Sequence, residues 1–405
     1  MSSVVRQSEK LRDVLYDIRG PVSARAAALE AEGHRILKLN IGNPQPFGFD
    51  APAEILQDVI AALPDSAGYS DSRGIQSARR AVVHNYQLQD GFPEIDVDDV
   101  WIGNGVSELI SIALQALRDN GDEVLIPVPD YPLWTAVTNL AGGVPVHYRC
   151  DEDNEWNPDL ADLESKITDR TKVIVVINPN NPTGAVYSRE TLAGIADLAR
   201  KHDLVLMADE IYDKILYDEA VHVPMASVAP DVLTLTFNGL SKAYRVCGYR
   251  AGWLMISGPK EVAEDFLEGL TLVANMRMCA NVPAQHAIQT ALGGYQSVQE
   301  LVVPGGRFYE QSKLASRLLN EIPGVSNVEP MGALYCFPRL DPEVYPIEDD
   351  EAFVIELLRA KKLLVTHGTG FNWPTHDHFR LVTLPDAQVL EEAIGRIADF
   401  LAARR

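Results

Sequence analysis

The sequence predicts an α/β protein, with a mostly parallel central sheet between helices and a smaller α+β domain beside it. Two observations lead to this prediction. Short runs rich in Val, Ile and Leu alternate with longer segments of helical periodicity, and these runs are too continuously apolar to have a solvated face. The two ends of the chain lack this alternation, so we expect them to form a different kind of unit.

The apolar runs are the expected strands of the central sheet. In chain order they are 100–103 (VWIG), 123–128 (EVLIPV), 172–178 (KVIVVIN), 204–209 (LVLMAD), 233–238 (LTLTFN) and 252–256 (GWLMI). Helical patterns occupy 106–119 and 189–202, as parallel strands require of their crossover connections. We assign this large domain to residues 50–295.

The flanking segments predict the smaller domain. A long amphipathic helix is expected at about 306–321, short strands near GALYCFP and FRLVTLP, and a final helix at 386–405. The first 49 residues contain LNIGNPQPFGFD, which is too rich in Pro and Gly for the sheet. We therefore expect residues 1–49 and 296–405 to form one small domain, with a ligand cleft between it and the large domain.

Composition excludes several classes of protein. The 405 residues include 57 acidic and 35 basic side chains, a net charge of −22 that argues against nucleic acid as a partner. The four cysteines are far apart, and neither a signal peptide nor a membrane-length apolar run is evident, so we expect a cytoplasmic protein. We expect no metal site, because the histidines lack ligand spacing, and a solvated loop at His376-Asp377-His378.

Polar groups follow the ends of the expected strands, where open parallel sheets bind ligands. The turn at Gly105-Val106-Ser107 opens a helix whose free N–H groups suit a phosphate, although an ordinary capped turn would look the same. Tyr131, in a Pro-rich loop, is placed to stack on a flat ring or simply to pack. Asn181 lies in a rigid N-P-T-G turn. Asp209, at the end of an apolar run, needs a cation or serves as a helix cap.

The segment after the 233–238 run is the most informative one. Lys242 follows Gly239-Leu240-Ser241, and Arg250 precedes the next strand. A single Lys at such a position is usually a solvated surface residue. Several other functional groups are expected at the same edge of the sheet: an Asp, an Asn, a Tyr, an Arg and a helix N-terminus. Because these groups lie around it, Lys242 is a candidate nucleophilic amine.

These segments resemble the class I/II, fold-type-I aminotransferases that depend on pyridoxal 5′-phosphate (PLP). The stretch from Gly239 to Gly252 is similar to their lysine signature, and the resemblance covers essentially the whole chain. Five segments are closer to the bacterial alanine aminotransferases (glutamate–pyruvate transaminases): YDIRGP, LNIGNPQPFGFDAP, FNGLSKAYR, ANVPAQHAIQTALGGYQS and HGTGFNWP.

The resemblance implies a role for each residue around PLP in the large domain. Lys242 would hold the cofactor covalently and carry a proton during the reaction. Asp209 would pair with the ring nitrogen, and Asn181 and Tyr212 would hydrogen-bond the phenolic oxygen. The remaining contacts would be stacking by Tyr131 and phosphate binding by Val106, Ser107 and Arg250, with Tyr69 reaching a neighbouring subunit's phosphate in a homodimer with shared sites.

Substrate contacts are implied in the same way. Arg380 resembles the family arginine that binds the α-carboxylate, and a backbone N–H at Gly42 would approach the same group. Our hypothesis for Tyr16 and Arg19 is that they fold over the pocket, Arg19 meeting the γ-carboxylate of glutamate; a salt bridge that fixes the N-terminal arm explains Arg19 equally well. The expected reaction is ping-pong transfer between L-alanine and 2-oxoglutarate, giving pyruvate and L-glutamate.

The same residues are compatible with other functions. An aspartate or broad-specificity aminotransferase is the nearest alternative, and a carbon–sulfur lyase on the same fold comes next. A lyase would release pyruvate and ammonia without an acceptor oxo acid. Ligand-sensing transcription regulators of this fold carry a DNA-binding domain before the sheet. Here fewer than 50 residues precede the sheet and the chain is strongly acidic, so we do not expect such a regulator.

Overall fold

The computed structural model describes residues 5–11, 14 and 20–405, and its centre is an eight-stranded sheet of order β2-β9-β8-β7-β6-β3-β4-β5. The strands are β2 (Val100–Gly103), β3 (Glu123–Val128), β4 (Val144–Asp151), β5 (Asn157–Pro158), β6 (Thr171–Ile177), β7 (Val205–Asp209), β8 (Thr234–Gly239) and β9 (Gly252–Ser257). From β8 to β4 the neighbours are parallel, whereas β9 is antiparallel to β8 and β2, and β5 is antiparallel to β4. The carboxyl ends of β2, β3, β6, β7 and β8 therefore meet at one edge of the sheet.

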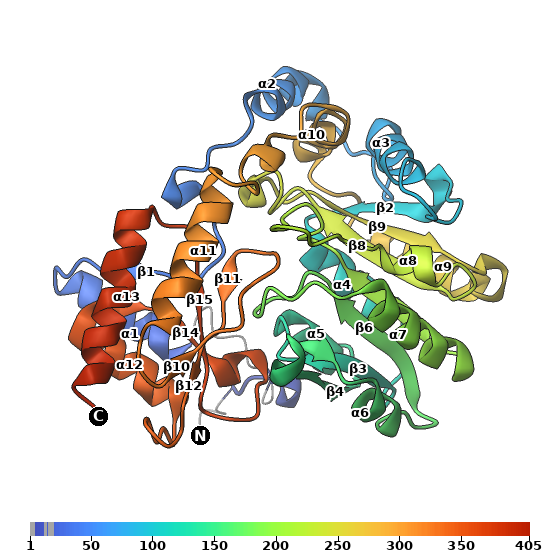
Figure 1. Ribbon diagram of the computed structural model, residues 1–405. Helices are drawn as coiled ribbons and strands as arrows, with labels where there is room; N and C mark the ends of the chain where they lie inside the picture. The colour runs from blue at the N-terminus through green and yellow to red at the C-terminus, as the bar shows by residue number, and fades with distance from the viewer. Residues whose placement is uncertain (1–4, 12–13, 15–19) are drawn as a thin grey trace.

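Helices cover both faces of this sheet (Figure 1). One face packs on α4 (Val106–Leu117), α5 (Leu133–Leu140) and α9 (Glu264–Met276); the other packs on α6 (Leu160–Ser165), α7 (Arg189–Lys201) and α8 (Met225–Val228). On that second face, α3 (Gln76–Gln87) and α10 (Val282–Gly293) cover β2 and β9, with α2 (Ala53–Ala62) against α10. Successive strand residues alternate between the faces, as Val124 and Leu125 do.

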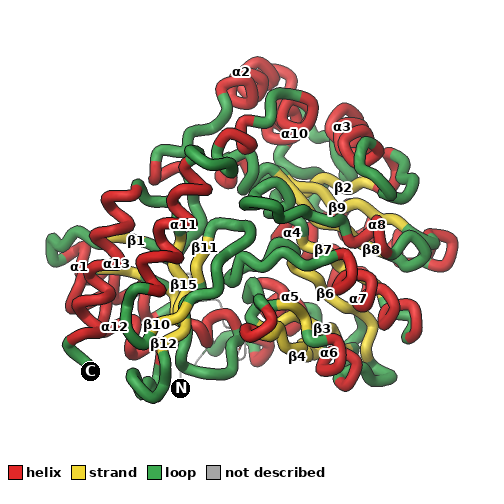
Figure 2. The backbone as a smooth tube through the Cα atoms, in the orientation of Figure 1, coloured by secondary structure: helices red, strands yellow, loops and turns green. Residues whose placement is uncertain are grey.

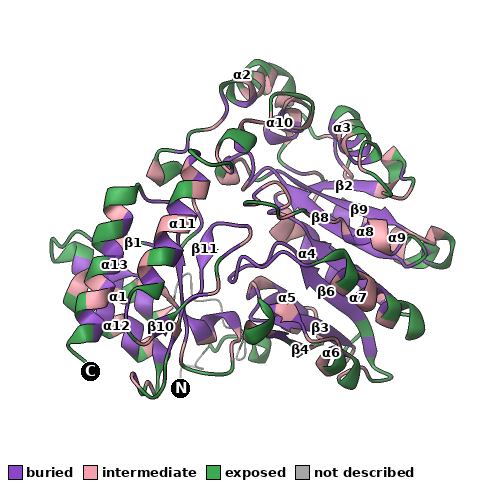
Figure 3. Cartoon of the chain, in the orientation of Figure 1, coloured by how far each residue is buried: buried purple, intermediate pink, exposed green. Residues whose placement is uncertain are grey.

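Every residue of β2, β3, β8 and β9 is buried, so the continuous apolar runs reflect a sheet covered on both sides (Figure 3).

The second unit joins both ends of the chain (Figure 2). Its helices are α1 (Pro21–Ala31), α11 (Arg307–Asn320), α12 (Asp350–Lys361) and α13 (Ala387–Ala402), and its short strands are β1 (Leu37–Lys38), β10 (Val325–Ser326), β11 (Tyr335–Cys336), β12 (Arg339–Leu340), β13 (Leu363–Leu364), β14 (Thr366–His367) and β15 (Phe379–Val382). Leu37 of β1 lies opposite Leu363 of β13 in a parallel pair, and α1 contacts α12. The division into domains at residues 50 and 295 stays a prediction.

Short 3-10 turns complete the described elements, at Glu9–Leu11 (η1), Gln45–Phe47 (η3), Leu63–Ser66 (η4), Val97–Asp99 (η5), Glu152–Asn154 (η6), Cys247–Tyr249 (η7), Lys260–Val262 (η8), Ser297–Glu300 (η9) and Gly368–Phe371 (η10). Among the described helices, none has the length and apolar character needed to cross a bilayer.

The expected α/β fold and all six expected strands of the sheet are confirmed, but two local features differ. The strands β4 and β5 were not predicted, because β4 is partly exposed and mixed in polarity and β5 is only two residues long. The expectation of a solvated loop at His376-Asp377-His378 is wrong for His378, which is buried between Asp377 (Nδ1 to Oδ1, 2.8 Å) and Glu152 (Nε2 to Oε1, 3.4 Å). Burial alone lowers the pKa of His378, but its hydrogen bonds to these two carboxylates raise it overall.

Candidate active site

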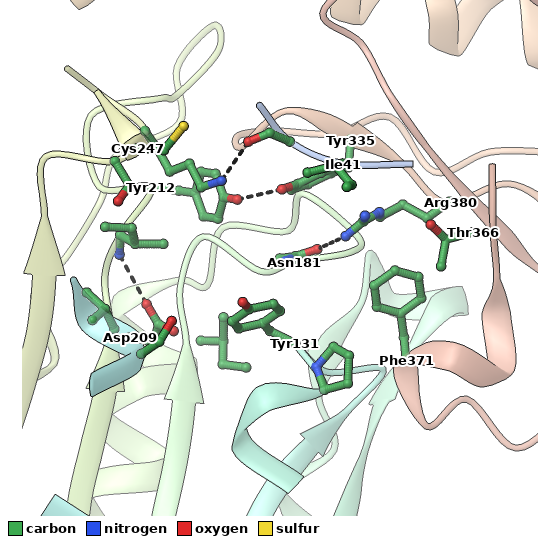
Figure 4. Close-up of a pocket in the computed structure, with 18 of the residues that line it drawn as sticks. Ile41, Tyr131, Asn181, Asp209, Tyr212, Cys247, Tyr335, Thr366, Phe371 and Arg380 are labelled. Atoms are coloured by element: carbon green, nitrogen blue, oxygen red, sulfur yellow. Dashed lines mark hydrogen bonds between the residues drawn. The ribbon is translucent and has the colours of Figure 1, made fainter. Parts of the chain in front are cut away.

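A cavity of about 280 Å³ opens where the carboxyl edge of the sheet faces the second unit (Figure 4). The sheet side contributes the residues at the ends of β2, β3, β6, β7 and β8, and the opposite wall contains Tyr335, Thr366, Phe371 and Arg380. The predicted site residues that line it are Gly42, Val106, Ser107, Tyr131, Asn181, Asp209, Tyr212, Lys242, Arg250 and Arg380. The structure thus brings together groups that are spread over more than 300 residues of sequence.

Lys242 lines this cavity from the loop that follows β8. Its Nζ donates a hydrogen bond to the carbonyl oxygen of Gly42 at 2.7 Å and lies 5.9 Å from the centre of the Tyr212 ring. The loop leaves the sheet at Gly239, where a Cβ would come within 2.8 Å of the Ala251 carbonyl oxygen. A glycine is therefore needed for the close approach that directs Lys242 into the cavity.

Asp209 ends β7 and is buried at the floor of the cavity. Its Oδ2 accepts a hydrogen bond from Trp134 Nε1 at 3.1 Å, and its Oδ1 accepts one from the Ile211 backbone at 3.3 Å. Burial raises the pKa of Asp209 to about 6, although these bonds and the charge of Lys242 oppose the increase. Asp209 also lines the cavity, so its carboxylate can accept a cationic or N–H partner there.

The opposite end of the cavity is built for an anion. Helix α4 begins at Val106 after Gly105, whose φ of 80° is a left-handed value that favours glycine. A Cβ on Gly105 would lie 2.4 Å from Arg250 Nη2, and one on Gly252 would lie 2.9 Å from the Val106 nitrogen. The two glycines let Arg250 and the first turn of α4, with its free N–H groups, converge on one place.

Arg380 forms the cationic wall on the side of the second unit. Its Nη1 donates to Asn181 Oδ1 at 2.8 Å and its Nη2 donates to the Asn40 carbonyl oxygen. The guanidinium lies between the rings of Tyr335 and Phe371, at 4.4 and 4.5 Å from their centres (Figure 4). Stacking on both faces fixes the plane of the fork, so its orientation is set before a ligand arrives.

Tyr212 is the buried phenol of the site. Its hydroxyl shares a 2.7 Å hydrogen bond with the hydroxyl of Tyr335. Burial and the neighbouring Tyr335 raise the pKa of Tyr212 well above its ordinary value, and Arg380 opposes this effect. The phenol therefore stays protonated and can donate a hydrogen bond at neutral pH.

One predicted residue that the structure describes, Tyr69, does not line the cavity. Tyr69 is 80% exposed, in the loop before α3, and its contact to a neighbouring subunit stays a prediction. Tyr16 and Arg19 lie outside the described residues.

Sequence reasoning missed Trp134, Tyr335 and Phe371. Trp134 closely follows Tyr131, while Tyr335 and Phe371 lie within the GALYCFP and HGTGFNWP segments. All three therefore lie in or beside segments that were already singled out, but the sequence does not show which side chains they contact.

Comparison with known proteins agrees with this geometry. Residues 34–397 match the family model for class I and II aminotransferases. The chain is 70% identical to an alanine aminotransferase of Mycobacterium tuberculosis over 98% of this chain and 93% of that protein. It is 58% identical to the glutamate–pyruvate aminotransferase AlaA of Escherichia coli over 99% of this chain and 98% of that protein.

Solved structures give the same picture. An aminotransferase from Escherichia coli has a TM-score of 0.98 at 57% identity and covers both chains completely. An alanine aminotransferase from Pyrococcus furiosus has a TM-score of 0.93 at 37% identity, over 98% of this chain and 100% of that chain. Fold and site together define a fold-type-I transferase that handles amino groups. The chain belongs to the class I and II aminotransferases, which depend on PLP.

The residues of the cavity fit this cofactor. A phosphate requires N–H groups and a cation in close approach, and Gly105 and Gly252 leave space for both at α4. A ring nitrogen requires a buried acceptor, and Asp209 has an open position on the cavity side. When bound, PLP supplies the carbon that takes the amino group and a ring that accepts electrons from the substrate.

Proposed function

We propose that this enzyme moves the amino group between L-alanine and 2-oxoglutarate, giving pyruvate and L-glutamate, in a ping-pong sequence. The observation that carries the substrate choice is the 70% and 58% identity, over nearly the full chain, to relatives named alanine aminotransferase and glutamate–pyruvate aminotransferase. An aspartate aminotransferase of Geobacillus stearothermophilus is only 31% identical.

The contacts described above support a role for each residue at the cofactor. Lys242 holds the cofactor and moves the proton, because it lines the cavity and its amine is hydrogen-bonded to a backbone carbonyl rather than paired with an acid. Asp209 accepts from the ring nitrogen. The phenolic oxygen is bound by the Asn181 amide and the Tyr212 hydroxyl, the ring is covered by Tyr131, and the phosphate is bound by the Val106 N–H, Ser107 and Arg250.

Arg380 then binds the α-carboxylate of each substrate through its stacked guanidinium, and Gly42 lines the same cavity. A Cβ on Gly42 would meet the Tyr335 hydroxyl at 2.2 Å, so only glycine allows this close approach. Orienting the carboxylate directs the substrate's Cα–H bond toward Lys242, which removes and returns the proton.

We further propose a cytoplasmic homodimer with shared sites. Tyr69, Leu272, Met276 and Met278 are exposed by 80%, 64%, 79% and 53%, and apolar side chains so exposed on one chain are typical of an interface with another. Tyr16 and Arg19 are predicted to close over the pocket in that assembly.

The substrate choice is tested by adding single amino acids to the holoenzyme without an acceptor. L-Alanine and L-glutamate should each change the visible absorbance of the bound cofactor. L-Alanine should release pyruvate and L-glutamate should release 2-oxoglutarate, each in an amount equal to the bound cofactor. L-Aspartate should cause no change. A Lys242→Ala variant is the control, and it should show neither transfer nor the absorbance change. A response to aspartate alone would contradict the proposal and favour the aspartate alternative.

A further inference from the structure

A buried carboxyl group outside the cofactor site links the two walls of the cavity. Asp130 lies in the loop after β3, between Pro129 and Tyr131, and its side chain is fully buried. Burial raises the pKa of Asp130 to about 7, against the effect of its hydrogen bonds from Asn372 and Thr135. A buried acid is unfavourable for folding unless it is well bonded, so its partners indicate what it contributes.

Two of its bonds cross from the sheet to the segment around η10. The Asp130 backbone N–H donates to the carbonyl oxygen of Phe371 at 3.1 Å, and Asn372 Nδ2 donates to Asp130 Oδ1 at 2.6 Å. Asn372 has a φ of 58°, a left-handed value that Asn tolerates better than most residues. The segment is therefore held to the sheet at two adjacent residues.

The remaining bonds fix the carboxylate from within the sheet unit. Thr135 Oγ1 donates to Asp130 Oδ2 at 2.9 Å, and His147 Nε2 lies 2.9 Å from the same hydroxyl. When Asp130 is ionised, the single proton of the threonine hydroxyl goes to the carboxylate, and His147 then donates to Thr135. Burial, with a smaller effect of Lys166, lowers the pKa of His147 to about 4, so the ring donates as a neutral imidazole.

The hydrogen bonds between Asp130 and the segment of Phe371 and Asn372 join two parts of the cavity wall. Tyr131 and Pro132, which follow it, line the cavity, as does Phe371. The Phe371 ring in turn stacks on the Arg380 guanidinium. A shift of the segment around Asn372 would move one of the two rings that hold the fork of Arg380 in its plane.

We propose that Asp130 and Asn372 form a latch that positions Phe371, and through it Arg380, against the face of the cavity formed by Tyr131. Asp130 is a positioning residue, since it acts on the substrate through these side chains. The proposal rests on the assignment of Arg380 to the substrate carboxylate. Loss of the latch should weaken substrate binding while leaving the cofactor bound.

The test compares Asn372→Gly with Lys362→Gly in the holoenzyme. Lys362 also has a positive φ, of 54°, and lies at the end of α12, so the control introduces the same kind of change elsewhere in the second unit. Asn372→Gly removes the two hydrogen bonds that Asn372 Nδ2 donates, to Asp130 Oδ1 at 2.6 Å and to Thr135 Oγ1 at 3.3 Å. Their loss should raise the KM for L-alanine roughly tenfold, with kcat changed less. The dissociation constant of an unreactive dicarboxylate, measured by calorimetry, should rise in parallel, and the cofactor absorbance should stay unchanged. Lys362→Gly should match the wild type in all of these.

A swap of the two side chains tests the pairing itself. Asn372→Asp alone places two carboxylates where the wild type has a 2.6 Å hydrogen bond, and KM should rise further than in Asn372→Gly. Adding Asp130→Asn restores an acid–amide pair and should return KM to within about threefold of the wild type. A double variant no better than Asn372→Asp, or equal KM values for the two glycine variants, would overturn the latch.

Arg380→Lys separates this inference from the proposed function. If that change leaves KM and dicarboxylate binding as in the wild type, the carboxylate assignment fails, and the latch proposal fails with it. If Arg380→Lys weakens binding while Asn372→Gly does not, the latch alone is wrong.

Discussion

Burial controls the charge of Asp209 more than any ion pair does. The carboxylate has Trp134 Nε1 and a backbone N–H as neighbours, and Lys242 lowers its pKa less than burial raises it. A carboxyl group in this position is costly when ionised and unpaired, and the cost is removed when a cationic ring nitrogen binds. The residue is thus suited to a partner that arrives with the cofactor.

A pH-dependent stability difference should follow from Asp209. Its pKa is about 6 in the folded chain and 3.8 in an ordinary setting, so the folded state binds more protons between these values. The free energy of unfolding of the cofactor-free protein should therefore fall as pH rises from about 4 to 6, relative to Asp209→Asn, by about 3 kcal/mol in total. Urea unfolding of both proteins at several pH values measures this. A difference that does not vary with pH would contradict it, and bound cofactor should stabilise the wild type more than the variant.

At the scale of the element, the turn from β2 into α4 depends on glycine for two separate reasons. Gly105 has a φ of 80°, and the position of its missing Cβ is occupied by the guanidinium of Arg250. Arg250 has a φ of 56° and is held by the carbonyl oxygens of Cys247 and Asn104. The anion site is therefore formed by two backbone segments that fix one another.

Gly105→Ala should disturb this element in both stability and binding. Backbone strain should cost about 1–3 kcal/mol of unfolding free energy, and displacement of Arg250 should weaken cofactor binding at least about tenfold. Gly121→Ala is the control, because Gly121 also has a positive φ, of 89°, but no atom within 4 Å of the added Cβ. Thermal unfolding and cofactor titration report the two effects. Equal cofactor affinity in the two variants would show that the contact with Arg250 is unimportant.

The elements that the sequence predicted best are those whose pattern is set locally. Runs such as 100–103 and 123–128 coincide with β2 and β3, because a strand buried on both faces must be apolar throughout. The partially exposed β4 has no such constraint and was missed. Family resemblance assigned Asp209, Lys242 and Arg380 to the site, and the structure places all three in the cavity.

The contacts that orient these groups could not be predicted. Trp134 reaches Asp209 across 75 positions and Tyr335 reaches Tyr212 across 123, and a single sequence contains no record of such pairings. Neither the Pro-rich loop before Trp134 nor the GALYCFP strand specifies which side chain it will contact. The orientation of the site thus depends on tertiary packing, which only the folded chain defines.

At the scale of the whole molecule, a strongly acidic chain contains a cationic cavity. The net charge is −22, yet Lys242, Arg250 and Arg380 line the pocket that receives anionic substrates. The negative surface keeps the protein dispersed, and the local cations set the binding. Tyr69 is exposed on the described chain, and we propose that it contributes to the site of a neighbouring subunit.

Subunit mixing should reveal whether Tyr69 serves a neighbouring site. The Tyr69→Ala homodimer and the Lys242→Ala homodimer are each expected to have impaired activity. In a mixed dimer, the site with an intact Lys242 would receive the intact Tyr69 of the other subunit, so activity should return on mixing to about a quarter of the wild-type value. Activity is assayed after unfolding and refolding the two variants together, with each variant refolded alone as the control. No recovery, or a monomer by sedimentation, would contradict shared sites.

The contact between Arg380 and the backbone of Asn40 joins positions 340 residues apart in the chain. During synthesis at about 5–20 residues per second, roughly 20–70 seconds separate the appearance of these two groups. The sheet and Lys242 are complete well before Arg380, the proposed anchor for the substrate carboxylate, exists. An unfinished chain on the ribosome can therefore assemble the cofactor side of the pocket, but it has no means of holding a substrate. Amino transfer becomes possible only once the last part of the protein has been made and has folded back onto the first.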